Sequence, residues 1–154
     1  MSTRTDQPPR AHPRAGANQD IPSVELMDGL VQVSYAVIGL LNRVAAAHDL
    51  SLTQLRVLAI LRDREPKISD LANHLGLERS SVSGLVDRAV TRGLVRRRAG
   101  DEDAREVRVR LTAKGQRLAG LLTVEVDALL GELTGRLGPV DRRRLSGLLG
   151  QLLR

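Results

Sequence analysis

Residues 68–112 read ISDLANHLGLERSSVSGLVDRAVTRGLVRRRAGDEDAREVRVRLT. Two glycines, Gly76 and Gly93, divide this stretch, because a residue without a Cβ can take the left-handed backbone conformation that ends a helix. Ser69 has the residue type and position of an N-terminal helix cap. The pattern predicts helices over residues 70–75 and 79–92, followed by strands over 94–99 and 105–111 with an acidic turn between them.

The helix expected over residues 79–92 has one apolar face and one small polar face. Its apolar residues recur at i, i+3, i+4 and i+7, which predicts a single buried stripe of Val82, Leu85, Val86 and Ala89. The opposite face carries Arg79, Ser80, Ser81, Ser83, Gly84, Asp87, Arg88 and Thr91. Side chains this small let a helix enter a DNA major groove, where Arg can bind guanine and Ser can bind phosphate or a base edge.

The hairpin expected after Gly93 is rich in arginine. In its second strand Val107, Val109 and Leu111 alternate with polar residues, which is typical of a half-buried antiparallel hairpin. The arginines expected at its tip and outer face are Arg96, Arg97, Arg98 and Arg105. Two short helices followed by such a hairpin have the order of a winged helix-turn-helix, whose wing meets the phosphate backbone or enters a minor groove.

Four short motifs in this stretch resemble the MarR family of bacterial transcriptional regulators. They are residues 80–88 (SSVSGLVDR), 93–97 (GLVRR), 103–105 (DAR) and 111–115 (LTAKG). Each motif alone is weak, but the four occur in order at the family's spacing. The resemblance covers the chain from about residue 24 to its end.

The resemblance implies a homodimer that binds palindromic operators. In the family the serine-rich helix lies in the major groove and the arginine of the Asp-x-Arg motif lies in the minor groove. By position these roles fall on residues 79–88 and on Arg105, with Asp103 expected to orient Arg105.

The segments that flank this stretch are predicted to be helical. Residues 24–48 form a long helix capped by Ser23, with apolar residues on two sides, and residues 112–137 and 139–153 form two more. Ordinary core packing is one interpretation of their leucine stripes. These helices carry more apolar surface than a small winged helix can cover, which favours dimerisation.

The whole pattern predicts a mainly α fold of order α-α-α-α-β-β-α-α. Residues 21–154 are expected to form one MarR-like domain, with a DNA-binding lobe at about 51–111 and dimerisation helices at 23–48 and 112–153. Residues 1–20 are predicted to be a disordered tail. Their arginines are expected either to stay in solvent or to touch DNA as a basic arm.

A capping box opens the helix expected from residue 52 to Leu61. Ser51 and Gln54 have the required spacing, and Leu50 and Leu55 are placed as the hydrophobic staple. Thr53 and Gln54 lie near the N-terminus of this helix, where contacts with phosphate are expected.

Composition points to nucleic acid and away from catalysis. The chain has 154 residues, a formal net charge of +6 and a pI of about 11.1, which favours an anionic partner. Only Lys67 and Lys114 are lysines, and the excess of arginine fits either phosphate and guanine recognition or a GC-rich genome. No Ser-His-Asp order or phosphate loop occurs, so we expect no enzyme.

Metal, redox and membrane functions are not expected either. The chain has no cysteine, which excludes disulfides and thiolate sites. The three histidines share no ligand spacing, and the acidic turn at 101–103 is expected to balance nearby arginines rather than bind a cation. No signal peptide or membrane span is evident, so we expect a cytoplasmic protein without a cofactor.

The resemblance also implies a small effector, often anionic or phenolic, between the dimerisation helices and the lobe. Such a ligand would change the separation of the two recognition helices. The polar or aromatic candidates for this site are Tyr35, Arg43, His48 and Arg56. The competing interpretation makes Tyr35 a packed residue with a satisfied hydroxyl and His48 a charge at a helix C-terminus.

Two functions remain open from the sequence. The first is a sequence-specific DNA-binding regulator, expected to be a repressor that an effector releases from DNA. The second is a winged-helix module that binds a protein partner and uses its basic charge for solubility. The arginine-rich wing and the small-residue helix face favour the first, because a protein-binding module needs neither.

Overall fold

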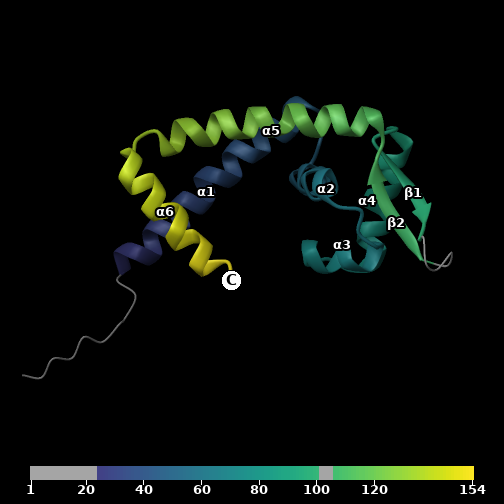
Figure 1. Ribbon diagram of the computed structural model, residues 1–154, viewed down its shortest axis with the longest axis horizontal. Coiled ribbons are helices and arrows are strands. Elements are labelled where there is room, and N and C mark those ends of the chain that lie inside the picture. Colours follow the sequence, from purple (N-terminus) through teal and green to yellow (C-terminus); the bar gives the residue numbers. More distant parts are fainter. Residues whose placement is uncertain (1–23, 101–105) are drawn as a thin grey trace, which may run out of the picture.

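The computed structural model describes residues 24–100 and 106–154. Its order of elements confirms the predicted winged helix-turn-helix. The elements are α1 (Val24–Ala47), α2 (Leu52–Asp63), α3 (Ile68–Leu75), α4 (Arg79–Thr91), β1 (Val95–Ala99), β2 (Val107–Leu111), α5 (Ala113–Thr134) and α6 (Pro139–Leu152). Figure 1 shows α5 running from the winged helix-turn-helix at one end of the molecule to α6 at the other.

Helices α2, α3 and α4 and the hairpin β1–β2 form one lobe around a leucine and valine core. Each of the five elements contributes to this core. The largest fully buried side chains are Leu58, Leu71, Val82, Val86, Val95 and Val109. The two strands pair antiparallel, with Val95 opposite Leu111 and Ala99 opposite Val107.

Local signals in the sequence set most of the helix ends. The Ser51 side chain accepts a hydrogen bond from the Gln54 amide at 3.2 Å, and the Gln54 side chain accepts one from the Ser51 amide at 2.8 Å, which confirms the capping box. Gly76 and Gly93 have φ angles of 65° and 69°. Both glycines therefore take the left-handed conformation expected where α3 and α4 end.

The start of α3 differs from the prediction. The helix begins at Ile68, two residues earlier than expected, its N-cap is Lys67 without a side-chain cap, and Ser69 lies inside the first turn. Lys67 forms a β-bridge with Arg108, and the Val109 amide donates a hydrogen bond to the Pro66 carbonyl at 3.0 Å. The wing thus holds the preceding backbone extended, a constraint that overrides the local capping signal.

One face of the wing is directed at the lobe rather than at solvent. Glu106 forms ion pairs with Lys67 at 2.7 Å and with Arg108 at 2.8 Å, and the Arg108 guanidinium donates to the Glu65 carbonyl. The hydrogen bond from Lys67 lowers the pKa of the Glu106 carboxyl. The expected alternation of β2 holds at Val109 and Leu111, whereas Val107 is 40% exposed.

Helices α1 and α6 leave most of their apolar side chains uncovered. In α1 only Val44 and Ala45, at its C-terminal end, are buried, and α6 has no buried residue. The exposed apolar residues of the two helices include Leu26, Met27, Val31, Val33, Ile38, Leu148, Leu149 and Leu152. The lobe therefore leaves uncovered the apolar surface that favoured dimerisation.

Helix α1 is also long and apolar enough to cross a membrane, judged by length and composition alone. The sequence-based expectation that no segment has these properties is wrong on this point. The C-terminal end of α1 nevertheless belongs to the core of the lobe, where α1 packs against α2 and α5. A helix anchored in this way can cover its remaining apolar surface with another protein chain.

The first turn of α5 packs directly on the start of the wing. The Thr112 hydroxyl caps α5 by accepting a hydrogen bond from the Gly115 amide at 3.1 Å. A Cβ placed on Gly115 would lie 2.0 Å from the Leu94 carbonyl oxygen. Only glycine fits here, because this contact is with backbone and cannot give way by a side-chain rotation.

Gly115→Ala should lower the free energy of unfolding by about 3 kcal/mol, with a fall in Tm of roughly 6–12 °C, because the added methyl group forces the backbones apart. Thermal denaturation followed by circular dichroism measures the change. Gly120→Ala in the same helix is the matched control, since a Cβ there meets nothing within 4 Å, and it should raise stability by about 0.5–1 kcal/mol. Equal effects of the two substitutions would contradict the proposed contact.

Candidate nucleic-acid interface

Helix α4 presents the small polar face that the sequence predicts. Its apolar stripe is buried, and Arg79, Ser80 and Ser81 at its N-terminal end are exposed. Ser83 and Gly84 are half-buried in the middle of the helix, and Asp87 and Arg88 are exposed beyond them. One Arg88 guanidinium nitrogen would lie 3.6 Å from a Cβ on Gly84. Because Gly84 has no side chain, Arg88 has room to lie along the helix surface.

The wing is joined to α4 by an ion pair on this same face. Arg97 of β1 binds the Asp87 carboxylate, with 2.5 Å between Nη1 and Oδ1, and it donates a longer hydrogen bond of 3.4 Å to the Ser83 hydroxyl. The Arg97 guanidinium lowers the pKa of the Asp87 carboxyl. Three of the residues predicted to contact DNA thus contact one another.

The other predicted contact residues differ in how the structure places them. Arg96 and Arg98 are exposed on β1 next to Arg97. Thr53 and Gln54 are half-buried, and Gln54 lies beside the C-terminal half of α4 while its side chain completes the capping box. Asp103 and Arg105, together with the tail at 1–20, Ser23 and the acidic turn, lie outside the described residues.

The four residues predicted for an effector site do not come together. Tyr35 is 72% exposed on α1, which also rules out the alternative that it is packed within its own chain. The His48 ring pairs with Glu125 of α5 at 2.9 Å, and the Arg56 guanidinium donates to the His74 carbonyl of α3 at 2.9 Å. Arg43 does not line the cavity described next.

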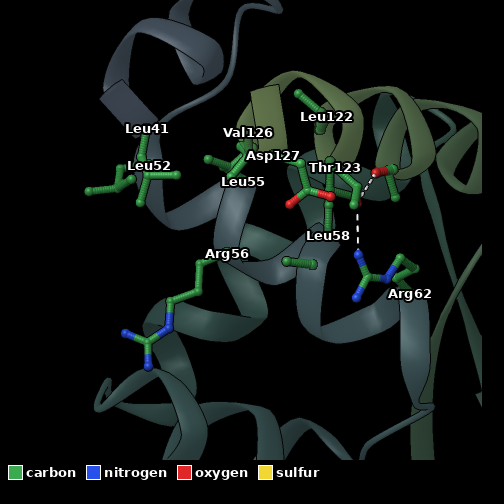
Figure 2. Close-up of a pocket in the computed structure, with 12 residues that line it drawn as sticks. Leu41, Leu52, Leu55, Arg56, Leu58, Arg62, Leu122, Thr123, Val126 and Asp127 are labelled. Atoms are coloured by element: carbon green, nitrogen blue, oxygen red, sulfur yellow. Dashed lines mark hydrogen bonds between the residues drawn. The ribbon is translucent and has the colours of Figure 1, made fainter. Parts of the chain in front are cut away.

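A cavity of about 480 Å³ lies between α1, α2 and α5. Its wall is mainly apolar, with Leu41 from α1, Leu55 and Leu58 from α2, and Leu122 from α5. Arg56 is the one predicted residue that lines it. Figure 2 shows the Arg56 guanidinium extending from α2 away from this leucine cluster.

The polar residues of this cavity that the sequence analysis missed are Arg62, Thr123 and Asp127. Arg62 donates to the Thr123 hydroxyl at 2.8 Å, a bond drawn in Figure 2, and to both oxygens of Asp63 at 2.8 and 2.7 Å. The Asp63 carboxylate raises the pKa of Arg62. Thr123 and Asp127 stand one helical turn apart in an otherwise apolar stretch of α5, a signal that could have identified them.

Within residues 24–100 and 106–154, no group of three histidine or acidic side chains is arranged to hold a metal ion. His74 instead uses its ring locally: Nδ1 lies 2.7 Å from the Asp70 carbonyl oxygen, and Nε2 lies 3.1 Å from an Arg64 guanidinium nitrogen. Nε2 must accept from Arg64, so His74 carries its proton on Nδ1 in this arrangement.

Comparison with known proteins identifies the family. The MarR family model matches residues 48–106. The solved transcriptional regulator PA4135 is 31% identical, with a TM-score of 0.71, and the match covers 86% of this chain and 96% of that one.

The chain belongs to the MarR family.

Two further solved structures share the fold of this MarR-family chain. A mutant MarR from E. coli complexed with operator DNA is 26% identical, with a TM-score of 0.70, over 85% of this chain and 95% of that one. NadR in complex with 4-hydroxyphenylacetate is 27% identical, with a TM-score of 0.69, over 94% and 96%.

Two relatives from Bacillus subtilis are also named as HTH-type transcriptional regulators. The uncharacterized HTH-type transcriptional regulator YfiV of Bacillus subtilis is 37% identical over 71 residues, which are 46% of this chain. The HTH-type transcriptional repressor YetL of the same species is 28% identical over 108 residues, which are 68% of this chain. The chain spans 44% of the length of YfiV and 65% of that of YetL.

The Asp87–Arg97 pair should be visible in the titration of the Asp87 carboxyl. The folded pKa lies below the ordinary value of 3.8, so the pair persists above that pH and is lost as the pH falls through the folded pKa. Carboxyl ¹³C shifts measured against pH should give a midpoint that rises toward 3.8 in Arg97→Ala. Arg117→Ala, which removes an exposed arginine of α5, should leave the midpoint in place, and an unmoved midpoint in Arg97→Ala would contradict the pairing.

Proposed function

We propose that this chain is a homodimeric DNA-binding repressor that acts in the cytoplasm on palindromic operators. The observation that carries the proposal is the exposed serine-rich face of α4 beside an arginine-bearing wing. The complex of the E. coli MarR mutant with operator DNA supports it, because that protein has the same fold.

Helix α4 is proposed to enter the major groove. Ser80 and Ser81 are short enough for close approach, and Arg88, lying along the helix over Gly84, can reach a guanine edge with two nitrogens. Arg79 at the first turn is placed for a phosphate, which the positive end of the helix dipole also attracts. Ser83 and Asp87 are proposed to act mainly through Arg97, which they hold.

The wing is proposed to supply sequence-independent affinity. Arg96 and Arg98 are exposed on β1, and Arg105, which the family motif assigns to the minor groove, follows the turn of the hairpin. Arg97 is fixed against α4 by Asp87, so the wing and the recognition helix would approach the duplex as one unit. Thr53 and Gln54 are proposed as further phosphate contacts near the start of α2.

Two copies of the chain are proposed to join through the uncovered apolar faces of α1 and α6. A two-fold dimer places its two α4 helices on one side of the duplex, about one turn apart, and so selects inverted half-sites about 10 base pairs apart. Burying an apolar face of this length is the ordinary driving force for an obligate dimer.

An effector is proposed to bind in the cavity between α1, α2 and α5. Apolar side chains, among them several leucines, line most of the wall, and Arg62 is the cation that hydrogen-bonds from α2 to α5. A small apolar carboxylate would seat its apolar part on the leucines and compete with Asp63 and Thr123 for Arg62. The NadR complex with 4-hydroxyphenylacetate supports this ligand class. Binding there would shift α2 against α5 and release the operator.

Selection of a duplex from a random library, followed by sedimentation of the selected complex, tests the proposal. We expect an inverted repeat bound by two copies of the chain. A chain that sediments as a monomer and enriches no sequence would contradict the proposal and favour the protein-binding alternative.

Arg88→Ala and Arg96→Ala should weaken DNA binding in different ways. Without Arg88, the difference in binding free energy between the selected base and the other bases should fall by about 1–3 kcal/mol, because a guanine contact carries sequence information. Loss of Arg96 should weaken binding to every sequence and reduce the magnitude of the salt slope by about 0.9, the contribution of one phosphate contact. Anisotropy titrations at several salt concentrations separate the two, and identical effects would contradict the assignment.

Arg62→Ala should weaken the binding of 4-hydroxyphenylacetate by about tenfold to a hundredfold, as expected for a lost charged hydrogen bond of about 1.5–3 kcal/mol. Isothermal titration calorimetry measures the affinity, with Arg117→Ala as the charge-matched control. Absence of heat from a panel of aromatic acids, with no loss of DNA binding, would rule out this ligand class.

A further inference from the structure

The C-terminal end of α4 is tied to the C-terminal end of α1 by one arginine. Arg92, the C-cap of α4, donates from Nη1 to the Asp49 carbonyl at 2.7 Å and from Nη2 to the His48 carbonyl at 3.2 Å. These two carbonyls come directly after the last turn of α1.

The backbone turn after α1 leaves two carbonyls available to Arg92. Asp49 has a φ angle of 54°, a left-handed conformation that is uncommon for a residue with a side chain. The turn it makes leaves the two carbonyls without intrahelical partners, at the negative end of the α1 dipole. A planar guanidinium can bind both at once, which the single ammonium of lysine does far less well.

Two further contacts bring α5 to the same place. The Lys114 ammonium donates to the Arg92 carbonyl at 2.9 Å, and the Thr112 hydroxyl donates to the Gly93 carbonyl at 2.6 Å. His48 pairs with Glu125 of α5 at 2.9 Å. The first turn of α5 therefore meets the end of α4, and the middle of α5 meets the end of α1.

Helices α1 and α4 share little other packing, whereas α1 packs against α2 and α5. The buried stripe of α4 belongs to the same core as Val44 and Ala45 of α1. The guanidinium of Arg92 adds direct hydrogen bonds between the recognition helix and the end of α1, a helix of the proposed dimer interface.

We propose that Arg92 is a positioning residue that fixes the angle of α4 relative to α1 and α5, and thereby the spacing of half-sites that the dimer accepts. The proposal rests on the proposed function, since it assumes two copies that bind one duplex. Arg92 itself need not touch DNA. Its loss would leave each lobe folded and α4 still joined to α5 through residues 92–94, but with a wider range of angles between α4 and the helices α1 and α5.

The first test measures the angle without DNA. The chain has no cysteine, so spin labels can be placed at Val90→Cys on α4 and Gly120→Cys on α5, both exposed. Labelled chains are diluted with unlabelled protein, and the distance distribution within one chain is measured by pulsed electron resonance. We expect one narrow peak, lost in Arg92→Ala, intermediate in Arg92→Lys and kept in Arg117→Ala.

A peak as narrow in Arg92→Ala as in the parent chain would overturn the proposal, whatever the DNA results. Thermal denaturation of each variant identifies any loss of folding, and a folded Arg92→Ala that keeps the peak is decisive. Arg92→Lys provides a second reading if the alanine variant is unstable, because it keeps the charge and loses only the two-pronged bond.

The second test measures spacing preference. Duplexes carry the selected inverted repeat at its best spacing or with one base pair added or removed between the half-sites. We expect Arg92→Ala to reduce the parent chain's preference for the best spacing by about tenfold, while binding to an isolated half-site is unchanged. An unchanged spacing preference would contradict the proposal. Failure of the parent chain to bind any duplex would contradict the proposed function instead and leave the distance measurement decisive.

Discussion

The structure depends on a close backbone contact between the start of the wing and the first turn of α5. Gly115 packs on the Leu94 carbonyl at a distance that no side chain allows, and the Thr112 amide donates to the same carbonyl at 3.0 Å. Because backbone meets backbone, neither element can slide without breaking the other's hydrogen bonds. Residues 92–94 therefore form a joint at which α4 ends, β1 begins and α5 departs, and the Arg92 side chain ties this joint to the end of α1. Any movement of α5 is transmitted to the recognition helix and the wing through this joint.

The second constraint is the apolar surface of α1 and α6, which a single chain leaves exposed to water. Along α1 the buried positions are confined to the last turns, and along α6 there are none. Helical stability of such segments comes mainly from packing of the apolar face and only weakly from intrinsic propensity. The apolar faces of these two helices therefore need another surface to pack against, and in the proposed function a second copy of the chain provides it. The cavity lies beside this region, so an occupant of it would act on both α2 and α5, the two elements that connect the lobe with the rest of the chain.

Signals that act within a few residues could be predicted from the sequence. The glycine ends of α3 and α4, the capping box at Ser51 and the buried stripe of α4 all depend on neighbours along the chain. Features set by distant contacts could not be predicted. The start of α3 moves to Ile68 because β2 binds the preceding backbone, and Glu106 turns toward Lys67 instead of solvent. The effector candidates were chosen by residue type, but His48 is paired with Glu125, Tyr35 is exposed, and the cation that spans the cavity is Arg62.

The central claim is that two α4 helices occupy successive major grooves of one duplex. Protection of guanine N7 from methylation on a duplex selected by the protein tests it most directly, because N7 lies in the major groove. The account predicts two clusters of protected guanines on one face of the DNA, about 10 base pairs apart and related by two-fold symmetry. A single protected cluster, or a bound duplex without protected guanines, would contradict it.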